Sequence, residues 1–216
     1  MSSLPKPYFE RVHFALNQRE YADRLVKKWH YTHRVPGVVQ CVGTWHLDGG
    51  LFGDRGEAVA AIYFVLPPTQ WAAPVWELAR LIRSDDHALP PLTGLISATV
   101  RWIASHKLMN LLISYADAEY GHHGGIYQAA SWNYNGLRAP QTGGLSIGGS
   151  YIPNRTVSGL WGTKSPKLLA ERGIAAEQHY DQGKYLYWKA LSRDGEKKAA
   201  ALGLQKLAYP KPQAPQ

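Results

Sequence analysis

The sequence has a single cysteine and no long apolar run among its 216 residues. With Cys41 alone, no disulfide can form within the chain, and a reducing, cytoplasmic setting is expected. The longest apolar runs, such as Val59–Leu66, are far too short to span a bilayer. The N-terminal residues lack the apolar core of a signal peptide. These absences argue against a disulfide-stabilised secreted domain and against a membrane-spanning protein.

Acidic residues are scarce beside basic ones: 16 Asp and Glu stand against 24 Lys and Arg, a formal charge of +8. Such a balance favours an acidic partner, and nucleic acid is the usual one. The 13 tyrosines and 8 tryptophans fit that partner, because aromatic rings beside cations can stack on unpaired or flipped bases. For any single ring, packing in the core is the alternative interpretation.

Hydrophobic periodicity predicts a mixed α/β fold. The expected strands are Tyr8–Phe14 (or an extended arm), Val38–Leu47, Glu57–Leu66, Val75–Arg83, Asn110–Tyr115, Ser150–Pro153, Val157–Trp161 and Lys184–Leu191. The expected helices are Gln18–Trp29 (with an apolar face of Tyr21, Leu25 and Trp29), Leu92–Ser105, Gly124–Ser131, Ser165–Arg172 and Arg193–Leu207. We expect a single domain over residues 1–208 and a flexible Pro-rich tail over residues 209–216.

The stretch Glu77-Leu-Ala-Arg80-Leu-Ile-Arg83 resembles the fourth strand of the GCN5-related N-acetyltransferase fold, and Leu111–Asp117 resembles its fifth. The resemblance implies a mixed, mostly antiparallel central sheet flanked by helices, with a pyrophosphate loop after the fourth strand. It assigns cofactor binding to Arg80, Arg83, Thr93 and Gly94. The loop departs from the family pattern, because R-x-x-G-x-G is absent and two prolines lack N–H donors. A proline-stiffened connector is the alternative interpretation.

An ordered set of motifs gives a more specific resemblance. The set is His30-Tyr31-Thr32 with Pro36, Trp76–Leu81, Ser114-Tyr-Ala-Asp117, Gly121-His122, Ile126-Tyr127-x-Ala-x-x-Trp132-x-Tyr134-x-Gly136 and Lys184-Tyr-Leu-Tyr187. From about Tyr21 to Lys211 the chain resembles the Mom family, phage enzymes that turn DNA adenine into its N6-carbamoylmethyl form and so evade host restriction. The resemblance implies a DNA adenine N6-modifying transferase.

The exocyclic nitrogen of adenine is a poor nucleophile, so its modification needs a proton acceptor and donors for the developing charge. Asp117 ends a strand, where ligands collect in α/β folds, and is the expected base or orienting group. A turn cap is its alternative role. Tyr31 and Tyr127 are expected to donate hydrogen bonds or protons, and His30 is a candidate base. Ser114 is expected to orient Asp117 or to satisfy a backbone group.

Arg80 lies between apolar residues in its strand and therefore needs a partner. Three partners are possible for Arg80: a carboxylate such as Asp117, the anionic group of the donor, or the acid of a purely structural salt bridge. The molecule that donates the added group is either acetyl-CoA or a glycine-derived molecule. The family resemblance also implies iron as a possible cofactor. No compact metal-ligand motif accompanies it, although four histidines could converge: His30, His33, His122 and His123.

An adenine inside a duplex is out of reach, so binding of double-stranded DNA with base flipping is expected. The candidate contacts are Arg34, Arg138, Arg155, Lys164 and Lys167, with Trp132 or Tyr134 as a ring that stacks on a base. Lys197, Lys198 and Lys206 on the last helix would add phosphate contacts. A solvated basic face is the alternative for the lysines. A homodimer is left open.

Two other functions fit the same residues. An N-acetyltransferase for a protein or small molecule would bind acetyl-CoA and need no DNA, and the missing R-x-x-G-x-G counts against it. A non-enzymatic basic module would shield DNA by occupancy and leave the mass of its bases unchanged. The resemblance of Ser114–Tyr127 to a catalytic segment counts against that module by analogy.

Overall fold

The computed structural model describes residues 10–48, 56–67 and 71–211, without the side chains of Pro153 and Arg155. The chain forms two compact units. The first unit comprises Met1–Tyr115, Gly124–Asn135 and Tyr187–Tyr209, and the second comprises Ala116–His123, Gly136–Leu186 and Pro210–Gln216. The expectation of a single domain with a C-terminal tail stays a prediction.

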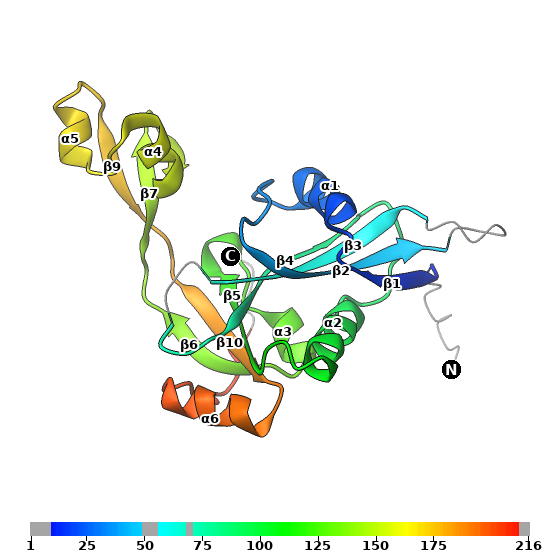
Figure 1. Ribbon diagram of the computed structural model, residues 1–216. Coiled ribbons are helices and arrows are strands. Elements are labelled where there is room, and N and C mark those ends of the chain that lie inside the picture. The colour runs from blue at the N-terminus through cyan, green and yellow to red at the C-terminus, as the bar shows by residue number, and fades with distance from the viewer. Residues whose placement is uncertain (1–9, 49–55, 68–70, 212–216) are drawn as a thin grey trace, which may run out of the picture. The chain divides into compact units, whose positions relative to one another are not determined.

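A seven-stranded sheet in the order β1-β2-β3-β4-β5-β10-β6 carries the fold. Its strands are β1 Val12–Leu16, β2 Val39–Leu47, β3 Ala58–Val65, β4 Trp76–Arg83, β5 Leu111–Asp117, β6 Asn133–Arg138 and β10 Lys184–Ala190. Strands β1 to β4 pair antiparallel, and β4 pairs parallel with β5. Helices flank this sheet (Figure 1), so the predicted mixed, mostly antiparallel fold class is confirmed.

Strand β3 is buried along its whole length. Its sequence, AVAAIYFV, is a continuous apolar run, as expected for a strand covered on both faces. Helix α1 (Arg19–Trp29) packs on one face beside Val42 and Tyr63. Helix α2 (Thr93–Ser105) packs on the other, where Thr99 approaches Gly43 of β2. Figure 1 shows these two helices on opposite sides of the sheet.

Helix α1 turns Ala22, Leu25 and Val26 toward the sheet, whereas Tyr21 is exposed. The predicted apolar face is therefore wrong at Tyr21, because the buried stripe runs one residue later along the helix. The Tyr63 hydroxyl donates a 2.6 Å hydrogen bond to Asp23 on the same helix, which fixes α1 on β3.

The second unit contains a three-stranded sheet in the order β8-β7-β9, made of β7 Thr142–Ile147, β8 Ser150–Pro153 and β9 Ala176–Tyr180. Helices α4 (Asn154–Trp161) and α5 (Pro166–Ala170) pack with this sheet around a core of Leu145, Val157 and Leu169. The predicted strand Val157–Trp161 is wrong. Val157 and Trp161 are four positions apart in the sequence, so a helix places both side chains on the same face, against that core.

Helix α5 has the capping residues that its sequence predicts. At α5, Ser165 accepts a hydrogen bond from the Leu168 N–H, Pro166 takes the first helical position, and Gly173 follows with φ +74°. Helices α3 (Gly125–Ala129) and α6 (Arg193–Ala201) are shorter than predicted.

None of the helices in the described part of the chain is long and apolar enough to cross a membrane.

We expect Gly43→Ala to lower the free energy of unfolding by about 1–3 kcal/mol through overpacking. A Cβ at Gly43 would overlap Thr99 Oγ1 and lie 2.9 Å from Ile62 Cγ2. Gly37→Ala is the matched control, because nothing lies within 4 Å of a Cβ there. Urea unfolding measures both variants. Equal midpoints would contradict the packing argument.

We expect Cys41 to react with a disulfide-exchange reagent at about pH 8 only after denaturation, because the thiolate is the reactive form. Burial leaves the residue 1% exposed and raises its pKa to about 12. The folded pKa lies above the ordinary value of 9.0, so the associated stability is complete below that pH and is lost as the pH rises through about 12. Release of the reagent's chromophore measures the reaction; equal rates for folded and denatured protein would refute burial.

Candidate active site

Strands β4 and β5 pair over three residues and then part. Trp76–Leu78 pair with Leu112–Ser114, whereas β4 continues to Arg83. A register shift in the pairing with β3 leaves Ala79 as an extra residue in β4. Such bulges re-aim side chains and are frequent beside active sites. The strand therefore delivers Arg80 just where its pairing with β5 has ended.

Tyr127 is a buried phenol in the first unit. Helix α3 begins after Gly124, which has φ +82°, and the Tyr127 N–H donates to the Gly124 carbonyl at 2.9 Å. Burial, aided by the charges of Tyr31 and Glu77, raises the pKa of Tyr127 to about 12, although a hydrogen bond with Ser114 acts in the opposite direction. Tyr127 therefore keeps its proton at neutral pH and can donate it, but cannot serve as a base.

Ser114 is fully buried and donates a 2.8 Å hydrogen bond to the Leu78 carbonyl of β4. This bond lies at the last residue pair before the two strands part. Of the two roles expected for Ser114, satisfying a backbone group is the one that this geometry performs. Its contact with Tyr127 ties the phenol to the same junction.

Tyr31 lies in the turn after α1 and is 44% exposed. The buried His30 ring stacks on it, with ring centroids 4.4 Å apart. The Thr32 N–H donates to His30 Nδ1 at 3.1 Å, so that nitrogen acts as an acceptor. This geometry supports one face of the Tyr31 ring, and the expected role of His30 as a base stays a prediction.

Arg80 and Tyr31 belong to the same cluster as Tyr127. Arg80 donates from Nε to the Arg34 carbonyl at 3.3 Å and from Nη1 to the Ala79 carbonyl at 2.6 Å. Burial lowers the pKa of Arg80, and the charges of Tyr31 and Glu77 oppose that shift. The structure thus brings Arg80, Tyr31, Ser114 and Tyr127 together, and their roles in chemistry stay predictions.

Glu77 is a candidate that the sequence analysis missed. It is half-buried on β4, and its charge acts on the pKa values of both Tyr127 and Arg80. A signal was present in the sequence, since Glu77 stands between Trp76 and Leu78 in an otherwise apolar strand start. An acid in such a place is rarely buried without a partner or a function.

Tyr187 and Gln128 complete the surroundings of Tyr127, and neither was assigned a role from sequence. The buried Tyr187 ring lies with its centroid 5.2 Å from Tyr127 and 5.3 Å from Tyr134. Gln128 Nε2 donates to the Tyr187 hydroxyl at 3.0 Å. The Tyr187 ring contributes to the burial of Tyr127, and that burial is the main physical cause of the raised pKa of Tyr127.

Trp132 and Tyr134 lie inside the first unit. Trp132 is fully buried and Tyr134 is 8% exposed. The expectation that either ring stacks on a DNA base needs correction, because in this conformation neither presents a free face. The Trp132 indole N–H has no hydrogen-bond partner within the described residues, so one buried donor remains near Tyr127, whose ring centroid is 5.6 Å away.

Asp117 belongs to the second unit, at the end of β5. Its Oδ1 accepts a 3.2 Å hydrogen bond from the Glu119 N–H and caps the 3-10 turn Ala118–Tyr120. Its Oδ2 lies 3.4 Å from Lys184 Nζ, and 15% of the side chain is exposed. The cap offered as its alternative role is present, and the exposed part leaves room for chemistry.

The loop before α2 offers few free amides for a pyrophosphate. Pro90 and Pro91 carry no N–H, and the Gly94 N–H donates to the Pro91 carbonyl at 2.9 Å. The Arg83 side chain is exposed, and Thr93 begins α2. These residues do not fit a coenzyme A cradle of the usual kind. Their cofactor roles stay predictions.

Metal binding has little support in the part of the chain that the structure describes. No group of three or more His, Cys, Asp or Glu side chains there could hold a metal ion. The described residues therefore do not fit an iron site.

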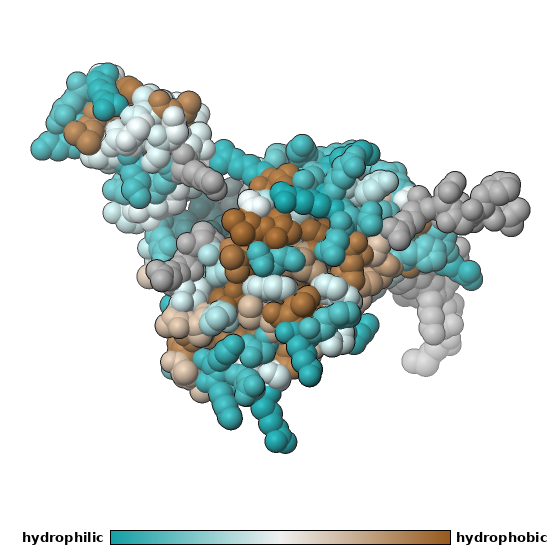
Figure 2. Space-filling view, in the orientation of Figure 1, coloured by the Kyte–Doolittle hydropathy of each residue, from teal (hydrophilic) through white to brown (hydrophobic). Residues whose placement is uncertain are grey.

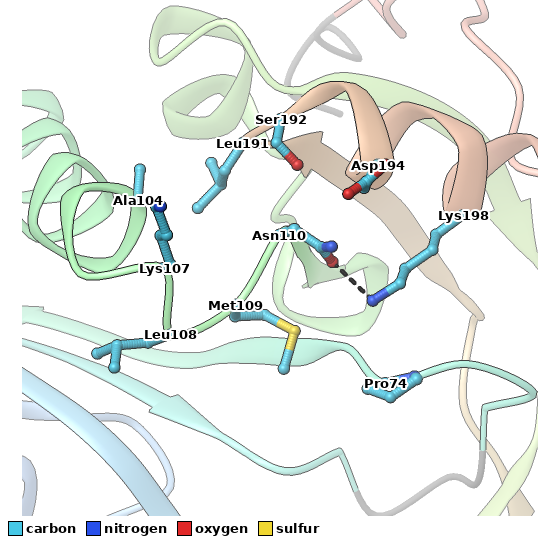
Figure 3. Close-up of a pocket in the computed structure, with 10 residues that line it drawn as sticks. All are labelled: Pro74, Ala104, Lys107, Leu108, Met109, Asn110, Leu191, Ser192, Asp194 and Lys198. Atoms are coloured by element: carbon cyan, nitrogen blue, oxygen red, sulfur yellow. Dashed lines mark hydrogen bonds between the residues drawn. The ribbon is translucent and has the colours of Figure 1, made fainter.

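A cavity of about 650 Å³ lies between the end of α2 and the start of α6 (Figure 3). Met109, Leu191 and Asn110 line it, and Lys198 Nζ donates to Asn110 Oδ1 at 3.0 Å. None of the expected catalytic residues lines this cavity. It is a separate feature from the cluster around Tyr127.

The cations expected to meet DNA divide between the units. Arg34 lies in the first unit, and Arg138, Lys164 and Lys167 lie in the second. Arg34, Arg138, Lys164 and Lys167 are exposed, and the side chain of Arg155 lies outside what the structure describes.

Comparisons with known proteins connect this arrangement to a family. The model of the Mom protein family matches residues 11–211. No curated protein matches the sequence. Solved structures similar to this chain include an N-acetyltransferase from Staphylococcus aureus Mu50, 8% identical, with 84% of this chain and 98% of that chain covered at a TM-score of 0.47. A spermidine N-acetyltransferase from Vibrio cholerae in complex with CoA and spermine is 7% identical, with 84% and 96% covered at a TM-score of 0.49. An acetyltransferase of the GNAT family from Streptococcus pneumoniae is 9% identical, with 84% and 100% covered at a TM-score of 0.46. These structures are too distant to carry an argument, whereas the family match spans nearly the whole chain.

We expect Gly124→Ala to disturb Tyr127 far more than Gly121→Ala does. Both glycines have a left-handed φ, +82° and +70°, so both variants carry backbone strain of about 1–2 kcal/mol. A Cβ at Gly124 would overlap the Tyr187 ring, whereas nothing lies within 4 Å at Gly121. Displacing Tyr187 admits water to Tyr127. Ultraviolet titration should therefore lose the tyrosine that ionises near pH 12 only in Gly124→Ala. Identical titrations would contradict this account.

Proposed function

Because the chain belongs to the Mom protein family, we propose that it is a transferase that modifies adenine at N6 in double-stranded DNA. The added group is carbamoylmethyl or a related small group, and the modification protects phage DNA from host restriction. The observation that carries the proposal is the family match over residues 11–211. The matched range includes Tyr31, Arg80, Ser114 and Tyr127.

The proposed step forms a bond between adenine N6 and a carbon of the donor. N6 loses one proton, and the donor loses its leaving group with the electron pair of the broken bond. Tyr127, which keeps its proton at neutral pH, is the proposed hydrogen-bond donor to the charge that develops on the donor molecule. Tyr31 is the proposed second donor, supported by its exposure and by the stacked His30 ring.

A carboxylate is the proposed acceptor of the N6 proton. Asp117 is the first candidate, supported by its place at a strand end and its partly exposed side chain. Glu77 is the second, supported by its influence on Tyr127 and Arg80. Arg80 is proposed to hold an anionic part of the donor, because its guanidinium donates hydrogen bonds of 2.6 and 3.3 Å to neutral backbone carbonyls and keeps further N–H groups for an anion.

The target adenine has to leave the duplex to reach these groups, since its N6 is paired and stacked inside the helix. The product depends on the donor. Acetyl-CoA would acylate N6 and expel the coenzyme A thiolate, which gives an acetyl adduct. A carbamoylmethyl adduct needs a glycine-derived donor whose methylene carbon carries the leaving group. The loop before α2 favours neither donor.

Nucleoside mass spectrometry of DNA from cells that produce the protein tests the proposal. The wild type is expected to yield a new adenosine species whose mass shift identifies the added group. We expect Asp117→Asn and Tyr127→Phe each to lower the yield by about 100-fold or more, the usual contribution of a positioned acid or base. Tyr180→Phe is the control, because Tyr180 is 63% exposed on β9.

Other outcomes discriminate between the candidates. Loss of product in Glu77→Gln with retention in Asp117→Asn would move the acceptor to Glu77. Unmodified adenosine together with nuclease protection that vanishes when the protein is removed would replace the proposal by DNA shielding. Acetyl-CoA consumption without DNA would replace it by N-acetyl transfer to another substrate.

A further inference from the structure

Helices α4 and α5, with the turn that joins them, carry exposed apolar side chains at one corner of the second unit. We call residues 154–173 the α4–α5 corner. Leu160 is 63% exposed and Leu168 is 42% exposed, whereas the core of this unit is made by Leu145, Val157 and Leu169. Figure 2 shows apolar atoms beside hydrophilic ones over these helices. Both leucines are therefore available to a partner.

The same corner is strongly basic. Residues 154–173 contain four basic side chains and one acidic side chain, a net charge of +3: Arg155, Lys164, Lys167 and Arg172 against Glu171. Lys164 and Lys167 are both exposed, and neither makes an ion pair within the described ranges. Lys184, in contrast, lies 3.4 Å from the carboxylate of Asp117. The charge at the corner is thus free to meet an anion.

The corner is held in a fixed shape. Arg172 Nη1 donates a 2.7 Å hydrogen bond to the Trp161 carbonyl, which ties the end of α5 to the end of α4. Gly162, with φ +67°, ends α4, and Ser165 caps α5. Leu160 and the two lysines are therefore carried on a frame that needs little ordering on binding.

We propose that the α4–α5 corner is the DNA-docking element, with Lys164 and Lys167 on phosphates and Leu160 against base edges in the minor groove. The inference rests on the proposed function. Proteins that bind the minor groove combine cations on the backbone with an apolar wedge, which partly unstacks a base step and bends the duplex. A step that is already unstacked lowers the free energy needed to flip a neighbouring adenine.

The first test measures binding of the intact protein to a fluorescent DNA duplex of about 25 base pairs across a salt series. We expect the double variant Lys164→Gln with Lys167→Gln to bind more weakly. The slope of log K against log salt should flatten by about 1.8, or 0.9 for each phosphate that a lysine no longer neutralises. Arg101→Gln with Lys107→Gln is the matched control, since both side chains are exposed on the first unit.

The second test measures DNA bending by energy transfer between dyes at the two duplex ends. Leu160→Ala is expected to keep the wild-type salt slope but to lose most of the bend. Leu137→Ala, which removes another leucine that is 51% exposed, should leave the bend intact.

Each remaining outcome overturns a stated part. In one outcome, the wild type binds and modifies DNA while the Lys164→Gln, Lys167→Gln variant shows the same salt slope as the Arg101→Gln, Lys107→Gln control. In that case the docking assignment is wrong and the proposed function stands. If the wild type binds no duplex DNA, or prefers an RNA duplex of the same sequence, both the docking assignment and the proposed function are overturned.

Discussion

Strand β3 is buried on both faces, and this constraint determines what its neighbours can do. An apolar run over Ala58–Val65 cannot face water on either side, so helices α1 and α2 have to cover both. The polar groups of the candidate site enter the first unit where two strands part. The β4–β5 junction is such a place, and Glu77, Arg80 and Ser114 gather there. The candidate site is in this sense a consequence of how the core is closed.

The elements around this core were predictable because their apolar patterns are long. Strands β2 and β3 and helix α2 each continue a regular pattern over eight or more residues, and their predicted bounds agree with the structure within about two residues. The second unit was less predictable. Strand β9 is five residues long with mostly exposed side chains, and it pairs with β7, which lies far earlier in the chain. Short segments of that kind owe their structure to partners that local spacing does not reveal.

The candidate site also has residues that the sequence predicted and residues that it did not. Tyr31, Ser114, Arg80 and Tyr127 were found through motif resemblance, and the structure brings these four together. The importance of Glu77 and Tyr187 comes from their influence on Tyr127, which is distant from both in sequence. The local sequence marks Glu77 only as an acid among apolar residues, and it does not show that either residue acts on Tyr127. An aromatic motif also does not say which way its rings face. The assignment of Trp132 and Tyr134 as base-stacking rings failed for that reason, since both pack inward.

The burial of Cys41 makes the natural sequence a ready background for site-specific labelling. The chain has no other thiol, so a cysteine introduced at an exposed position would carry a fluorophore or spin label without removal of the native residue. Tyr180 on β9 and Tyr21 on α1 are exposed positions in different units. A pair of labels at such positions would report the separation of the two units directly, both in the free protein and as DNA is added.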